Sequence, residues 1–166
     1  MGKKCPKRGL PRTFLSVFYN PFPARVPTFG SLILFHPNRQ TTMKMNAGIL
    51  TEKLAESKAF YTETLGFGIT FENDFYLLMH TPNRQAEISF LLPNHPSQQP
   101  FFHAPFGGEG LYLTIEVDDV DAWHQRLRNQ GVPVKVELRD EPWGDRHFAI
   151  EDPNGIGIDI VRYAPS

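Results

Sequence analysis

Residues 142–159 read P-W-G-D-R-H-F-A-I-E-D-P-N-G-I-G-I-D, and this stretch decides the fold. Residues 146–150 are a short run able to form a strand, and residues 156–160 alternate apolar with small or polar side chains. Such a period of two is typical of a β-strand with one buried face. Residues 152–155 (D-P-N-G) join a proline that sets φ to an Asn-Gly pair that tolerates positive φ. The stretch therefore predicts a β-hairpin.

Polar side chains stand on both strands of this predicted hairpin, at Arg146, His147, Glu151 and Asp159. A buried polar group needs a partner, which is another side chain, water or a ligand. Two interpretations follow. The side chains contact a ligand, or Arg146 or His147 simply forms a pair with a nearby carboxylate.

The rest of the chain predicts two copies of one unit, a strand followed by a helix and three more strands. The helices are expected at residues 54–65 and 119–130, where Gly66 and Gly131 end them. The strands are expected at residues 47–51, 67–71, 75–80, 87–92, 111–117, 132–138, 146–150 and 156–163. This order predicts an α+β fold with one domain over residues 45–166, built from modules at 45–92 and 109–163.

The period of two also assigns faces to the strands. The apolar residues of 111–117 and the isoleucines of 156–160 are expected to pack on the helices. The side chains between them are expected to line a concavity, the usual place for a ligand. The predicted ligand-binding residues are Tyr76, Glu87, Ser89, Tyr112, Thr114, Trp143, Arg146 and Asp159, with His147 beside them.

The N-terminal extension, residues 1–44, differs in composition from the rest. Residues 1–51 hold eight Lys or Arg and no Asp or Glu, which leaves nine basic residues against all 18 acidic ones in 52–166. The extension is also rich in proline, and we expect it to be disordered or to be upstream sequence from a start codon called too early, since Met43 and Met45 would also serve as starts. A targeting peptide and a basic arm for nucleic acid are the alternatives.

Composition also limits the partners. The chain has one cysteine, Cys5, so an intramolecular disulfide framework is excluded, and no apolar run approaches the roughly 20 residues that span a bilayer. We expect a cytoplasmic protein that binds neither membrane nor nucleic acid. A glycine-rich phosphate loop and a nucleophile elbow are both missing from the sequence, and a paired-carboxylate mechanism with Glu87 and Asp159 stays open.

Three segments resemble the vicinal-oxygen-chelate superfamily of glyoxalase I, bleomycin-resistance proteins and extradiol dioxygenases. They are W-G-x-x-x-F-x-x-x-D-P-x-G from Trp143, S-K-A-F-Y with L-G-F from Ser57, and V-D-D-V-D-A from Val117. They occur in the expected order over about residues 46–162, and the first is closest to the bleomycin-resistance-like branch. The resemblance implies paired βαβββ modules whose curved mixed sheet surrounds a cavity. It also implies a homodimer and a cavity bordered by an aromatic residue near Trp143.

Metal-using members of that superfamily carry His, Glu or Gln on four strands. At the corresponding positions this chain has Asn46, Tyr112 and Asp159, and the fourth position is at or beside Glu87. Two carboxylates without an imidazole make a poor site for Zn²⁺, Ni²⁺ or Fe²⁺, and an oxygen-only Mg²⁺ or Mn²⁺ site lacks ligands. We therefore expect no cofactor. If a divalent metal is bound, Glu87 and Asp159 are the expected ligands.

The sequence thus leaves three functions. The first, which we favour, is a metal-free binder of a small cationic or aromatic molecule, because the acidic body and Trp143 suit such a ligand. The second is a metal-dependent lyase, isomerase or dioxygenase with an altered metal site, so whether the chain is an enzyme stays open. The third is a structural or regulatory module without a ligand.

Overall fold

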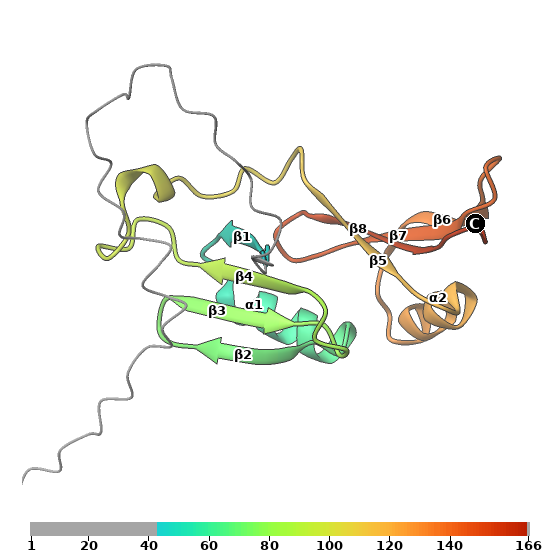
Figure 1. Cartoon of the computed structure of the whole chain (residues 1–166), viewed down its shortest axis with the longest axis horizontal. Coiled ribbons are helices and arrows are strands. Elements are labelled where there is room, and N and C mark those ends of the chain that lie inside the picture. Colours follow the sequence, from blue (N-terminus) through green and yellow to red (C-terminus); the bar gives the residue numbers. More distant parts are fainter. Residues whose placement is uncertain (1–42, 166) are drawn as a thin grey trace, which may run out of the picture. The chain divides into compact units, whose positions relative to one another are not determined.

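The computed structural model describes residues 43–165, and the expectations for the N-terminal extension lie almost entirely outside them. The described elements are two successive strand–helix–three-strand modules (Figure 1). The predicted α+β fold of paired βαβββ modules is therefore confirmed. Neither helix of the described part is long and apolar enough to cross a membrane.

The first module contains one four-stranded mixed sheet with the strand order β1-β4-β3-β2, in which β1 runs parallel to β4. Its elements are β1 (Ala47–Leu50), α1 (Leu54–Ala59), the π-helical turn η1 (Phe60–Thr64), β2 (Gly68–Glu72), β3 (Tyr76–His80) and β4 (Glu87–Leu91).

The second module repeats this plan with the order β5-β8-β7-β6, in which β5 runs parallel to β8. A connection that includes the 3-10 turn η2 (Pro100–Phe102) precedes it. Its elements are β5 (Tyr112–Glu116), α2 (Val120–Asn129), β6 (Val134–Asp140), β7 (Arg146–Glu151) and β8 (Gly157–Arg162).

The first predicted helix differs from the expectation in its second half. The α-helix ends at Ala59, and Phe60–Thr64 continue it as a π-helical turn. Thr62 Oγ1 donates to the Lys58 carbonyl at 2.7 Å, which is the acceptor that an α-helix would offer to the Thr62 amide. This local competition favours the wider turn, in which Tyr61 is fully buried.

The second helix begins and ends as its sequence predicts. The Asp119 side chain accepts from the Ala122 amide at 2.9 Å and caps the first turn. Gly131 follows the last turn with φ of 76°, a conformation that glycine adopts without steric cost. Val120 and Leu127 are fully buried on the face toward the sheet.

The strands β5 and β8 alternate between core-facing apolar and exposed or polar side chains as predicted. Ile156, Ile158 and Ile160 are fully buried in a core that continues through both modules, whereas Tyr112 on β5 is 70% exposed. Helices and core cover one face of each sheet. The opposite face is called the open face below.

The tip of the β7–β8 hairpin binds the first module through polar contacts. The Tyr61 hydroxyl donates to Asp152 Oδ2 at 3.2 Å, the Thr51 hydroxyl donates to Asn154 Oδ1 at 2.7 Å, and Asn154 Nδ2 donates to Ser57 Oγ at 2.9 Å. Asp152 is only 4% exposed. These five residues are called the hairpin clamp.

Asp152 also builds the turn itself. Its Oδ1 accepts from the amides of Asn154 at 2.8 Å and of Ile156 at 2.9 Å. Gly155 has φ of 84°, the left-handed conformation predicted for this position. The same carboxylate thus fixes the turn and joins the modules.

We predict that Asp152→Ala lowers the free energy of unfolding by about 2–4 kcal/mol, because it leaves several buried donors without an acceptor. Chemical denaturation measures this loss. Asp74→Ala, in an exposed turn, is the matched control and changes stability by about 0.5 kcal/mol or less. Equal losses in the two variants would contradict the role of the clamp.

Candidate functional site

A cluster of charged side chains lies on the open face of the second module. His147 Nδ1 lies 2.7 Å from Asp159 Oδ1, and His147 Nε2 lies 2.9 Å from Glu141 Oε1. Arg139 Nε donates to the same Glu141 oxygen at 2.6 Å. The sheet register explains the grouping, since β7 places His147 opposite Arg139 of β6 and Ala149 opposite Asp159 of β8. We call these four side chains the imidazole cluster.

The partners of His147 favour its charged form. The hydrogen bond with Asp159 is the main cause that raises the pKa of His147; burial opposes this rise, and Glu141 adds to it. The hydrogen bonds from His147 and then Arg139 hold the pKa of Glu141 below its usual value. With a carboxylate at each ring nitrogen, protonated His147 can donate from both nitrogens, and neither nitrogen then points at a free site for use as a general base.

Two exposed aromatic residues belong to the same module. Tyr112 is paired with Gly157 on the strand that carries Asp159, and its neighbour Thr114 is paired with Asp159 itself. Trp143 is 67% exposed in the turn between β6 and β7, where its Nε1 donates to Asp145 Oδ2 at 2.8 Å. This bond holds the indole nitrogen while most of the ring surface stays available for stacking.

Three further predicted residues gather in the first module. Tyr76 and Ser89 are buried on adjacent strands, and Glu87 accepts from Thr70 at 3.2 Å. Burial raises the pKa of Tyr76; a hydrogen bond with Ser89 opposes this rise, and the charge of Glu87 adds to it. Glu87 and Asp159 thus stand on different sheets, and each has a partner of its own, Thr70 and His147.

Arg146 lies apart from the other predicted residues, on the helix side of its sheet. It forms a two-pronged ion pair with Asp121 of α2 at 2.8 and 2.9 Å and contacts Asp140 at 3.0 Å. Asp121 and then Asp140 raise the pKa of Arg146. The period of two could have predicted this, because Arg146 shares its strand face with the buried Phe148 and Ile150.

Glu141 is the member of the imidazole cluster that the sequence did not indicate. It follows β6, where two register shifts interrupt the pairing with β7. A β-bulge changes which face of the sheet the following side chains point to. Strict alternation therefore does not predict the face on which Glu141 lies. His147, by contrast, does pair with Asp159, as the second interpretation of the hairpin expected.

The positions that correspond to metal ligands in the superfamily do not fit a transition metal. Asn46 and Tyr112 are exposed and offer an amide and a phenol, and Asp159 is held by the His147 ring. Over residues 43–165, no group of three or more His, Cys, Asp or Glu side chains has the arrangement to hold an ion. This donor set lacks both imidazole ligands and a shared centre.

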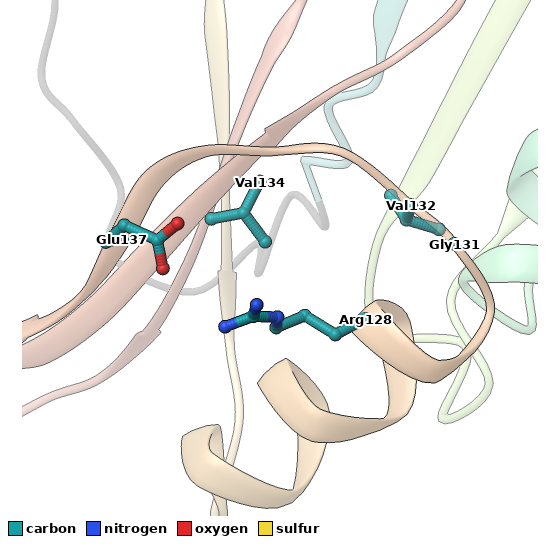
Figure 2. A pocket seen from close by; sticks show the side chains of 5 residues that line it. All are labelled: Arg128, Gly131, Val132, Val134 and Glu137. Carbon is teal, nitrogen blue, oxygen red and sulfur yellow. The ribbon is translucent and has the colours of Figure 1, made fainter.

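Two surface pockets lie on the helix sides of the sheets. One, of about 250 Å³, is lined by residues of α2 and β6, with Arg128 pointing toward Val134 and Glu137 (Figure 2). The other, of about 370 Å³, lies between α1 and the β2–β3 turn, where Lys58 and Glu72 form an ion pair. Neither contains a predicted ligand-binding residue.

Comparison with known proteins agrees with this architecture. The family model described as the Glyoxalase/Bleomycin resistance protein/Dioxygenase superfamily matches residues 43–160, more than half of the chain. The chain belongs to this superfamily. An uncharacterized Mycobacterium bovis protein is 43% identical over 49 residues, which cover 30% of this chain and 32% of that protein, so the match spans about a third of this relative.

Solved structures share the fold at low identity. TnmS3, an antibiotic-binding protein from Streptomyces, is 23% identical with a TM-score of 0.60, over 76% of this chain and 99% of that one. A bleomycin-binding protein complexed with bleomycin is 18% identical with a TM-score of 0.54, over 74% of this chain and all of that one. At this identity the likeness establishes the fold alone, so the roles of the predicted site residues stay predictions.

We predict that His147 stabilises the fold most at mildly acidic pH. The pKa of His147 is higher in the folded protein than its ordinary value of 6.5. Protonation of His147 therefore stabilises the fold fully below pH 6.5, and this stabilisation is lost as the pH rises through the pKa of the folded state. The pKa of Glu141 is lower in the folded protein than its ordinary value of 4.5. Ionised Glu141 therefore stabilises the fold fully above pH 4.5, and this stabilisation is lost as the pH falls through the pKa of the folded state. The difference in melting temperature between the wild type and His147→Gln is therefore largest between pH 4.5 and pH 6.5, the two ordinary pKa values. A difference that grows as the solution becomes alkaline would contradict this.

Proposed function

We propose that the protein binds a small polar aromatic molecule on the open face of its second module, without a catalytic metal. The single observation that carries the proposal is the imidazole cluster. It concentrates four charged side chains on a sheet face outside the core, and the cluster includes Asp159 on the strand next to Tyr112. Charges at such a place are costly to assemble and are typical of a binding site.

The charges of the cluster define the chemistry of the ligand. Two cations, Arg139 and protonated His147, balance two carboxylates, so the cluster is close to neutral and does not demand a highly charged ligand. Asp159 Oδ1 accepts from His147, and the second carboxylate oxygen can accept from an ammonium or amide group of the ligand. Stacking on the exposed rings of Tyr112 and Trp143 adds aromatic selectivity.

The comparisons support this choice of function. One structural neighbour, TnmS3, is an antibiotic-binding protein, and another was solved with bleomycin bound. The two carboxylates that contact both ring nitrogens of His147 favour binding over a proton-transfer reaction, because a general base needs a free nitrogen.

The full site, as we propose it, forms in a cytoplasmic homodimer. The exposed Tyr112 and Trp143 then border a cavity completed by a second copy. Tyr76, Glu87 and Ser89 are the first module's contribution to ligand binding. Neither a nucleic acid nor a membrane is a partner in this proposal.

We predict that Asp159→Asn and Trp143→Ala weaken the binding of planar aromatic cations, including bleomycin. Truncating a desolvated charge partner typically costs on the order of 2–5 kcal/mol, so Asp159→Asn lowers affinity more than tenfold and Trp143→Ala lowers it less. Fluorescence titration and thermal shift measure both effects. Glu137→Gln, on the helix side of the same sheet, is the control and leaves the affinity unchanged.

Metal analysis of the purified protein separates this function from a metal-dependent enzyme. We expect ligand binding to survive dialysis against a chelator, because the proposed contacts use only side chains of the chain. If one equivalent of Zn, Ni, Fe or Mn survives dialysis, or if binding is lost with the metal, the metal-free proposal is wrong.

A further inference from the structure

Asn154-Gly155 at the tip of the β7–β8 hairpin is the only Asn-Gly pair in the whole sequence. Asparagine followed by glycine is the sequence most prone to spontaneous deamidation, since no side chain on the next residue hinders attack by its backbone nitrogen. Both atoms of the Asn154 carboxamide also take part in the hairpin clamp. A chemically labile side chain therefore stands at the polar junction between the two modules.

The folded structure holds the reacting groups of this pair in place. Asn154 Oδ1 accepts from Thr51 at 2.7 Å, and Nδ2 donates to Ser57 at 2.9 Å and to Asp152 Oδ2 at 3.0 Å. The Gly155 amide donates to the Asp152 carbonyl at 3.1 Å. The carboxamide cannot rotate toward the Gly155 nitrogen, and that nitrogen cannot lose its proton, until these bonds open.

We propose that Asn154 is a modification site at which deamidation, gated by opening of the hairpin clamp, permanently loosens the junction between the two modules. The Gly155 backbone nitrogen forms a bond with Asn154 Cγ, the Cγ–Nδ2 bond breaks, and Nδ2 leaves as ammonia with the proton from the Gly155 amide. Water then hydrolyses the resulting succinimide at either carbonyl. The products are aspartate, or isoaspartate with an extra backbone methylene.

Either product is incompatible with the clamp as it stands. The Ser57 hydroxyl can turn and donate to the new carboxylate, so that contact is recoverable. The contact with Asp152 is not recoverable. Deamidation replaces the Nδ2 donor, which lies 3.0 Å from Asp152 Oδ2, by an oxygen, and two carboxylates then face each other in a partly buried site. Isoaspartate also lengthens a turn in which Gly155 already has φ of 84°.

The experiment follows deamidation of the full chain by peptide mass spectrometry during incubation at mildly alkaline pH. In the native protein we expect Asn154 to deamidate at least tenfold more slowly than in the same chain in guanidinium chloride. Thr51→Val removes one bond to the carboxamide and accelerates native deamidation several-fold. Thr81→Val is the matched control, because it removes a similar Thr–Asn bond, to Asn83, in another turn and leaves the rate at Asn154 unchanged.

Melting temperature provides the second measurement. The deamidated fraction and Asn154→Asp melt several degrees below the wild type. Asn73→Asp does not, because Asn73 uses only its Oδ1 as an acceptor, for the amides of Phe75 and Tyr76. Equal deamidation rates in native and denatured protein, equal acceleration by both threonine variants, or an Asn154→Asp protein that melts with the wild type would each overturn the proposal.

Discussion

The Asp152 carboxylate is the constraint on which the rest of the structure depends. It is almost fully buried, and it accepts from the amides of Asn154 and Ile156, from the Asn154 side chain and from the Tyr61 hydroxyl. A buried carboxylate is tolerated only when such donors replace its hydration. Because three of these donors lie in the hairpin tip and one lies in the first module, local and long-range structure are fixed together.

This constraint reaches the candidate site through the register of the hairpin. The turn fixes Ile150 opposite Ile158, which leaves Ala149 opposite Asp159 on the open face. A slip of one residue would turn Asp159 toward the core and Ile158 toward solvent. The contact between Asp159 and His147 thus depends on turn geometry at the far end of the same two strands.

Much of this arrangement follows from residue types. Apolar periods predict the second helix, the start of the first helix and all eight strands to within one or two residues, and D-P-N-G predicts its turn. The remainder depends on contacts that no local pattern encodes. The π-helical turn goes with a side-chain bond from Thr62 to the Lys58 carbonyl, which periodicity does not show. The register shifts of β6 mean that alternation along the strand does not predict where Glu141 points. Arg146 lies on the helix side of its sheet instead, the face that it shares with the buried Phe148 and Ile150.

Hydrogen–deuterium exchange at the Ile156 amide tests the role of Asp152 most directly. This amide sits just after a turn, yet it donates to a buried carboxylate rather than to a strand partner. If the clamp organises the fold, the Ile156 amide exchanges as slowly as the core amides of β8, through global unfolding. Exchange at the rate of the exposed turn between β3 and β4 would show that the hairpin tip opens by itself, and would contradict the account.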